Sequence, residues 1–254
     1  MDNRSGRFFL RIAIPSLVVF SAFAGAQQAP PHWSYAGKEG PRDWGHIAPA
    51  YSECSLGHAQ SPINIQGTKV EDLPPLRFDY HPAPLDIIDN GHTVQVNYAP
   101  GNTLTVGGAT YTLKQFHFHH PSEEHVNGHR YDMVAHLVHT DASGHTAVVA
   151  VLFTVGQPNA LLETLWKHLP AEKGREDDVA GVTVDLERLL PADLGYYTFA
   201  GSLTTPPCSE GVTWYVLKTP VTLSAEQLAI FARLYPSDAR PIQPKNGREI
   251  LESR

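Results

Sequence analysis

Hydrophobic and polar residues alternate along several short stretches in the middle of the chain. The alternation is clearest in residues 93–98, 110–119, 131–140 and 146–155. A period of two residues is typical of β-strands, whose successive side chains point to opposite faces of a sheet. Two glycine-containing pairs, Asn90-Gly91 and Gly107-Gly108, supply turns, because glycine tolerates the positive φ that tight hairpins require. The pattern predicts a sheet built from meandering strands.

Helices are predicted to be few, short and peripheral. Asn159 can cap a helix that extends to His168, and Ser224 with Gln227 forms a capping box before an amphipathic segment. The charged stretch 172–178 is interpreted as a solvated loop. The predicted fold class is therefore mainly β: a single domain on a large, mostly antiparallel, twisted central sheet with a few short helices at its periphery.

The N-terminal segment has the composition of a secretory signal peptide. Three arginines within the first eleven residues precede an apolar run at residues 12–26 that ends in small residues. This run is shorter than the roughly 20 residues that a membrane-spanning helix needs, which argues against a membrane anchor. We predict a signal peptide over residues 1–26 and a periplasmic or secreted domain over residues 27–254.

Charge and cysteine content narrow the function classes. The chain of 254 residues has a net charge of −7, which does not suit nucleic acid or an anionic membrane, because both select basic patches. Its two cysteines, Cys54 and Cys208, would reach an oxidising compartment after export. We expect them to form one disulfide bond, with two separate buried thiols as the alternative.

A histidine pair on one predicted strand suggests a metal site. His117 and His119 are two residues apart, so their side chains project from the same face of the strand. A third ligand could come from the next strand, which carries His136 and His139 on opposite faces. Strand parity alone does not choose between these two residues. A hydrogen-bonded core histidine or adventitious metal binding by a histidine-rich surface are the alternatives.

Several motifs together resemble the alpha-carbonic anhydrase family, in its exported, bacterial form. They occur in the order of the family and cover nearly the whole exported chain: residues 32–35 (His-Trp-Ser-Tyr), 60–65 (Gln-Ser-Pro-Ile-Asn-Ile), 90–92 (Asn-Gly-His), 115–119 (Gln-Phe-His-Phe-His), 122–125 (Ser-Glu-Glu-His), 135–139 (Ala-His-Leu-Val-His), 202–207 (Ser-Leu-Thr-Thr-Pro-Pro) and 212–214 (Val-Thr-Trp). This resemblance implies zinc ligands His117, His119 and His136, with water in the fourth position. Three histidines and an open position form a catalytic zinc site, as in carbonic anhydrase itself.

The resemblance also assigns roles around the metal. Thr204 would accept the hydrogen of a zinc-bound hydroxide and donate its own to the buried carboxylate of Glu124. His92 would carry protons to buffer, with Tyr35 in the water network that it uses. Apolar carbon dioxide would lie near a pocket formed by Val138, Val148, Leu203, Thr205 and Trp214. Cys54 and Cys208 match positions that are bridged in exported members of the family.

The function that follows is zinc-dependent, reversible hydration of carbon dioxide to bicarbonate and a proton, which makes the chain a carbonic anhydrase, a zinc lyase. Zn²⁺ is the expected cofactor, and sulfonamides and anions are the expected inhibitors. The sequence is also compatible with a homodimer. The alternatives are a non-catalytic carbonic-anhydrase-like binding domain, a zinc hydrolase and a zinc buffer. Against a peptidase, the sequence contains no His-Glu-x-x-His helix that would supply the base.

One position departs from the family pattern. The family usually has Glu two residues before its third zinc histidine, whereas this chain has Val134. Losing such an outer hydrogen-bond partner typically weakens metal affinity or activity about 10- to 100-fold. We expect water or another side chain to accept the outer N–H of His136, with zinc held more loosely than in relatives with Glu. On this interpretation, Val134→Glu should slow zinc loss.

Overall fold

The computed structural model describes residue 1 and residues 31–254, apart from the side chain of residue 178. Residues 2–26 of the predicted signal peptide lie outside the described residues. No helix in the described part is long and apolar enough to cross a membrane.

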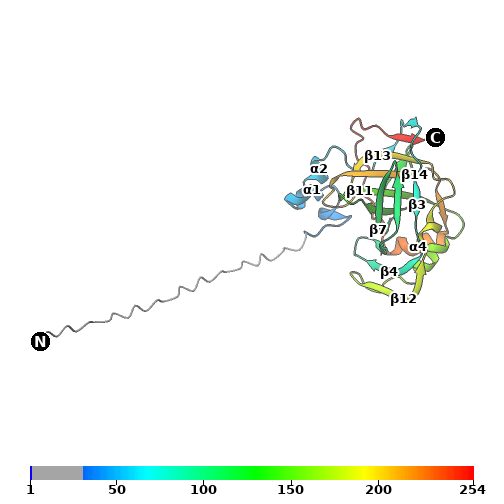
Figure 1. Ribbon diagram of the computed structural model, residues 1–254, viewed down its shortest axis with the longest axis horizontal. Helices are drawn as coiled ribbons and strands as arrows, with labels where there is room; N and C mark the ends of the chain where they lie inside the picture. The colour runs from blue at the N-terminus through cyan, green and yellow to red at the C-terminus, as the bar shows by residue number, and fades with distance from the viewer. Residues whose placement is uncertain (2–30) are drawn as a thin grey trace. The chain divides into compact units, whose positions relative to one another are not determined.

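One mixed sheet of 13 strands dominates residues 31–254 (Figure 1). Its strands are β2 (Lys69–Glu71), β3 (Arg77–Asp79), β4 (Ala83–Asp89), β5 (Val94–Asn97), β6 (Thr103–Val106), β7 (Ala109–His119), β10 (Met133–Thr140), β11 (Thr146–Val155), β12 (Glu176–Val184), β13 (Tyr196–Ser202), β14 (Glu210–Leu217), β15 (Val221–Leu223) and β16 (Leu251–Ser253). The main path runs β12-β4-β5-β7-β10-β11-β14-β13-β16-β2. β3 and β6 continue from β7, and β15 pairs with β11.

The remaining elements are short. A second sheet contains β1 (Asn64–Ile65), β8 (His125–Val126) and β9 (His129–Arg130). The helices are α1 (Trp44–Ile47), α2 (Glu53–Leu56), α3 (Ala160–Trp166) and α4 (Ala225–Leu234), with single 3₁₀ turns at Gly37–Glu39, Pro49–Tyr51 and Leu186–Leu189. The predicted fold class is confirmed.

Most strand pairs are antiparallel, as predicted, and the four long stretches of alternating residues form β5, β7, β10 and β11. The turn at Gly107-Gly108 joins β6 to β7 with φ of 56° and 85°, values that glycine adopts without steric penalty. Meandering neighbours do not explain the whole sheet, however. β14 and β15 both pair with β11 in parallel, and β16 pairs with β2 in parallel, because the chain crosses over before it returns.

Both predicted helix starts are confirmed. The Asn159 side chain accepts hydrogen bonds from the first turn of α3, and Ser224 with Gln227 forms the reciprocal capping box of α4. The loop prediction for residues 172–178 is wrong at its C-terminal end, because β12 begins at Glu176 and pairs with β4. β12 is the last strand on its side of the sheet. Charged residues are common on such an edge, where they discourage pairing with other chains.

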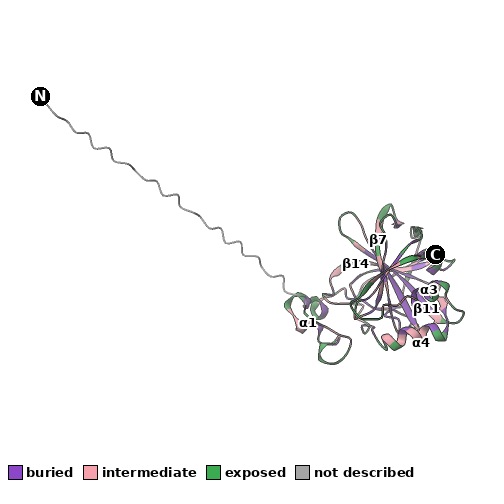
Figure 2. Ribbon diagram, turned by 90° about the horizontal axis from the view of Figure 1, so that it is seen from below, coloured by how far each residue is buried: buried purple, intermediate pink, exposed green. Residues whose placement is uncertain are grey.

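The central sheet has a different buried cluster on each face. Along β10, Ala135 and Leu137 belong to the larger hydrophobic cluster, whereas Val134 packs in a second cluster with Val148 and Trp214. Figure 2 shows the buried residues concentrated in the strands, with exposed residues on loops and on the outer sides of the helices. A single strand therefore supplies side chains to two separate environments.

The segment before β1 is fastened to the sheet by covalent and polar contacts. Cys54 and Cys208 form the predicted disulfide bond. Arg240 is almost fully buried, and its guanidinium donates hydrogen bonds to the carbonyl oxygens of Ser61 (2.7 Å) and Cys54 (2.9 Å). Its backbone N–H donates to Glu123 Oε1 at 2.7 Å. Arg240 thus joins three segments that are distant in sequence.

Candidate metal centre

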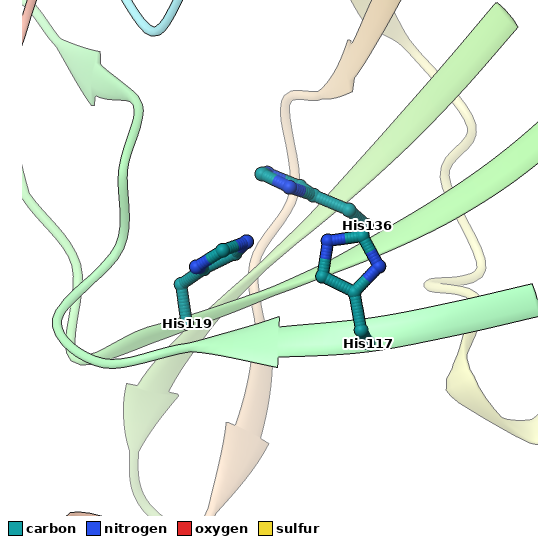
Figure 3. Close-up of side chains that lie close together, drawn as sticks. All are labelled: His117, His119 and His136. Carbon is teal, nitrogen blue, oxygen red and sulfur yellow. The ribbon is translucent and has the colours of Figure 1, made fainter. Parts of the chain in front are cut away.

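Three histidines from two neighbouring strands converge on one point. His117 and His119 project from β7, and His136 lies opposite His117 on β10. One nitrogen from each ring lies within 4.8 Å of the others, and Figure 3 shows the three side chains pointing toward one another. His139 occupies the other face of β10, where its Nε2 lies 2.7 Å from the hydroxyl of Tyr80. Of the two histidines on β10, His136 is therefore the one that lies with His117 and His119.

The outer nitrogen of each histidine has a protein partner. His117 Nδ1 lies 2.8 Å from Gln115 Oε1, His119 Nδ1 lies 2.8 Å from the carbonyl oxygen of Asp238, and His136 Nε2 lies 3.0 Å from Glu124 Oε1. Because these partners are oxygen acceptors, the outer nitrogens must carry the protons. The inner nitrogens are then His117 Nε2, His119 Nε2 and His136 Nδ1.

These inner nitrogens fit a single metal ion. His119 Nε2 is buried and has no hydrogen-bond partner among the described residues, which is rare for a polar atom unless a ligand completes its environment. Burial, followed by repulsion from His119 and His136, lowers the pKa of His117 well below its usual value. A neutral imidazole with a free lone pair is the form that binds metal. The donor set suits zinc with one open position.

Two adjacent glutamates beside the site make different contacts. Both oxygens of Glu124 face His136 Nε2, at 3.0 and 3.3 Å. Burial alone would raise the pKa of Glu124, but the charge and hydrogen bond of His136 outweigh it and lower this pKa. Glu123 accepts the Arg240 N–H, and its Oε2 lies 3.7 Å from His119 Nε2 and 3.9 Å from His136 Nδ1.

Thr204 and Glu124 were predicted to form a hydrogen-bonded pair, and the described structure contains no such hydrogen bond. Glu124 is engaged by His136 instead. Glu123 Oε2 is buried and without a partner among the described residues, so of the two glutamates Glu123 is the one with an oxygen left to accept from a hydroxyl donor. In the described part of the chain, Thr204 has no side-chain hydrogen bond to either glutamate, so its carboxylate partner stays a prediction. The sequence could not tell which glutamate keeps a free oxygen, since consecutive loop residues have no fixed facing rule.

The loop that carries Thr204 follows β13 and is held at several points. The Leu203 N–H donates to the carbonyl oxygen of Ser209 at 3.0 Å, and the Cys208 N–H donates to that of Thr205 at 2.8 Å. The disulfide bond fixes Cys208 to α2. Thr204 itself is buried. These contacts give the loop a defined position next to the sheet.

An apolar wall lies beside the histidines. Val148 and Trp214 belong to the cluster on the His136 face of the sheet, and Val138 and Leu203 pack against it. The Trp214 ring centroid lies 4.9 Å from that of His136, and its indole N–H donates to the carbonyl oxygen of Ser202 at 3.1 Å. Four of the five predicted pocket residues thus share one apolar surface.

A cavity of 130 Å³ connects the histidines to the predicted proton-transfer residues. It is lined by His117, His119 and Thr205 and by Trp33, Tyr35 and His92. The His92 ring stacks on Trp33 at 3.7 Å with an interplanar angle of 8°. Partial burial, followed by repulsion from His32 and Lys173, lowers the pKa of His92. The structure therefore brings His92 and Tyr35 to the same cavity as two of the three histidines.

Tyr35 is placed deeper than His92. Its hydroxyl is buried and has no partner among the described residues, and burial together with the charge of Glu123 raises its pKa well above the usual value. Tyr35 also lines a larger cavity of 540 Å³ with Arg130 and Arg240, which contains none of the three histidines. The two cavities therefore share Tyr35 in their lining, and the three histidines are absent from the lining of the larger one.

Sequence reasoning gave no role to Gln115, Asp238 or Glu123, although each contacts a histidine or lies within 4 Å of one. Gln115 could have been found, because it lies two residues before His117 on the same strand face. Asp238 contributes its backbone carbonyl, which any residue could supply, so the residue type at this position gives no indication of the contact. The large twisted sheet and its three-histidine group define a class of protein with a site that could hold one metal ion.

Comparison with known proteins agrees with this class. Residues 39–254 match the family model of eukaryotic-type carbonic anhydrase. The chain is 44% identical over 243 residues to a carbonic anhydrase of Pectobacterium carotovorum, covering 95% of this chain and 98% of the relative. It is 43% identical over 252 residues to a carbonic anhydrase of Neisseria gonorrhoeae, covering 98% and 99%.

A solved structure is similar in fold as well. The alpha-carbonic anhydrase of Thermovibrio ammonificans, in complex with the inhibitor sulfanilamide, matches with a TM-score of 0.84 and 41% identity over 88% of this chain and 100% of that chain. The chain therefore belongs to the alpha-carbonic anhydrase family, and it is an enzyme of the carbonic anhydrase type.

Proposed function

We propose that this enzyme catalyses the reversible hydration of carbon dioxide to bicarbonate and a proton at a zinc ion held by His117 Nε2, His119 Nε2 and His136 Nδ1. The observation that carries the proposal is the convergence of these three inner nitrogens, each on a ring whose outer nitrogen is already bonded. Zinc in such a site acts as a Lewis acid that makes water nucleophilic near neutral pH, as carbonic anhydrase itself exemplifies.

The residues around the ion have distinct tasks in this proposal. The Thr204 hydroxyl accepts the hydrogen of the nucleophile and donates its own to a carboxylate, which orients the attacking lone pair. We assign that carboxylate to Glu123 instead of Glu124, because Glu123 has the oxygen without a partner. Leu203 and Trp214 with the two valines, Val138 and Val148, form the surface against which carbon dioxide, an apolar molecule, lies.

Each hydration leaves one proton to be removed. His92 lies at the cavity, and histidine is the side chain whose ordinary pKa is closest to neutral pH, so His92 is the group suited to pass this proton to buffer. Tyr35 lines the same cavity with a hydroxyl free to bind water. The lowered pKa of His92 favours its neutral form, which is the form that accepts a proton.

We also propose that the domain over residues 27–254 acts in the periplasm or outside the cell after cleavage at residue 26. The signal-like N-terminus and the disulfide bond support this location, because disulfides persist in oxidising compartments. Sulfonamides are proposed to bind at the metal, as a relative in complex with sulfanilamide suggests.

A comparison of two histidine variants tests the site. His136→Gln removes a proposed ligand, whereas His139→Gln removes a histidine from the other face of the same strand. Mass spectrometry under native conditions should count one zinc per chain in the parent and in His139→Gln, and none in His136→Gln. Stopped-flow hydration of carbon dioxide should follow the zinc count and be blocked by a sulfonamide. Full activity in the metal-free parent would refute the proposal.

A further inference from the structure

The His136 ring is fixed by a carboxylate from outside its own strand. Its Nε2 lies 3.0 and 3.3 Å from the two oxygens of Glu124, and the exposed fractions of the two side chains are 2% and 0%. A carboxylate bonded in this way accepts, so the ring proton must be on Nε2. Nδ1 is then left with its lone pair toward His117 and His119.

We propose that Glu124 is the positioning residue for His136, and that from the loop after β7 it supplies the outer-shell carboxylate that Val134, on the strand itself, lacks. This inference rests on the proposed zinc site. Acceptance of the Nε2–H fixes the tautomer in which Nδ1 can bind the ion, holds the ring plane and raises the basicity of the ligand nitrogen.

Val134 cannot perform this task. It lies two residues before His136, so both side chains project from the same face of β10. It is fully buried in the apolar cluster with Ile63 and Ile65, and its side chain has no polar atom. Among the described residues, the side chain of Glu124 is the one that forms a hydrogen bond with His136 Nε2.

The backbone of Glu124 is held on both sides, which presets the carboxylate. On one side, Ser122 Oγ donates to the Glu124 carbonyl oxygen at 2.9 Å and accepts from the Tyr131 N–H at 2.9 Å. On the other side, β8 begins at His125, which pairs with Asn64 of β1. An outer-shell partner on a fixed backbone keeps its ligand in place without a rearrangement on metal binding.

This arrangement reverses the effect first expected of Val134→Glu. With Glu124 present, a glutamate at position 134 adds a second carboxylate beside one ring N–H in a site closed to water. Two carboxylates that share such a site repel one another, and a buried charge without a partner is unfavourable. Val134→Glu alone should therefore not slow zinc loss, and should help only when Glu124 no longer supplies a carboxylate.

The decisive experiment measures zinc release from the loaded protein to an excess of chelator in four proteins: the parent, Glu124→Gln, Val134→Glu and the double variant. Glu124→Gln keeps the shape of the side chain and removes its charge, and we expect release about 10-fold faster or more, the lower end of outer-shell effects. The double variant should recover most of this loss. Glu210→Gln is the control, because Glu210 bonds to Gln60 and forms no hydrogen bond with His117, His119 or His136.

A spectroscopic readout separates positioning from general stability. The visible spectrum of the cobalt-substituted protein should shift in Glu124→Gln and return toward that of the parent in the double variant, whereas Glu210→Gln should leave it unchanged. Nitrogen NMR of the zinc-loaded parent should find the His136 ring proton on Nε2. This last measurement needs no variant, so poor folding of Glu124→Gln would not rescue the inference.

The outcomes are distinguishable from failure of the proposed function. A parent that does not hold one zinc per chain would overturn the zinc site itself. If the parent holds one zinc but Glu124→Gln releases it at the parental rate, or if the His136 proton is on Nδ1, the site stands and the role of Glu124 is wrong.

Discussion

Acid should destabilise this protein partly through His139, a histidine outside the metal site. His139 is fully buried, and burial lowers its pKa from 6.5 to about 4. The unfolded chain therefore binds more protons than the folded chain between these two values. The stability that the protein keeps while His139 is neutral in both states is complete above about pH 6.5, and it is lost as the pH falls toward 4. At about 1.4 kcal/mol for each pH unit, the loss amounts to about 3 kcal/mol.

His139→Gln isolates this effect, because glutamine does not titrate and its amide can still bond to the Tyr80 hydroxyl. Urea denaturation at pH 7 and at about pH 4 measures how much free energy of unfolding each metal-free protein, parent or variant, loses between these two pH values. Metal-free protein avoids competition between protons and zinc. Other groups titrate in both proteins, so the difference between the losses reports His139. Equal losses in parent and variant would refute the reasoning.

Three further predictions concern the site and its support. His119→Ala or His136→Ala should remove both zinc and activity, because two imidazoles do not hold the ion against water; one zinc per chain with normal turnover in either variant would contradict the ligand set. His92→Ala should lower kcat for hydration while kcat/KM stays nearly unchanged, and imidazole buffer should restore the rate. Because the pKa of His92 is lowered, the pH profile of kcat in the parent should have its inflection below pH 6.5. An equal fall in kcat/KM would place His92 in the chemical step. Replacing Cys54 and Cys208 together by serine should lower Tm, because the disulfide bond joins residues separated by 154 positions and restricts the unfolded chain. Chain entropy limits its contribution to the free energy of unfolding to about 5 kcal/mol. An unchanged Tm would show that the bond adds no stability.

The elements built from local patterns were predictable from the sequence. Along β10, which carries His136, alternating residues belong to different clusters on the two faces of the sheet. Asn159 and Ser224 cap their helices through contacts only two or three residues away. The strand β12 was missed because its first residues are charged, and only pairing with β4 makes them a strand.

The site was predictable in its ligands and less so in their surroundings. The next predicted strand offered His136 and His139, between which parity could not choose. The family resemblance chose His136, which the structure places with the other two histidines. The partners of the outer nitrogens come from other segments: Glu124 lies in a loop, and Asp238 follows α4. No local periodicity relates such residues to a strand, so their contacts depend on the folded chain.

The buried guanidinium of Arg240 affects how the molecule can open. It is bonded to backbone oxygens on either side of residue 60, while its own N–H is held by Glu123 beside the histidines. The segment around α1 and α2 therefore cannot detach without breaking hydrogen bonds to Arg240, the residue whose backbone N–H holds Glu123 beside the histidines. Amide hydrogens of this short-helix segment should exchange with solvent by the same cooperative opening as the sheet, instead of by local fraying. A peripheral-looking segment is thus part of the unit that keeps the site assembled.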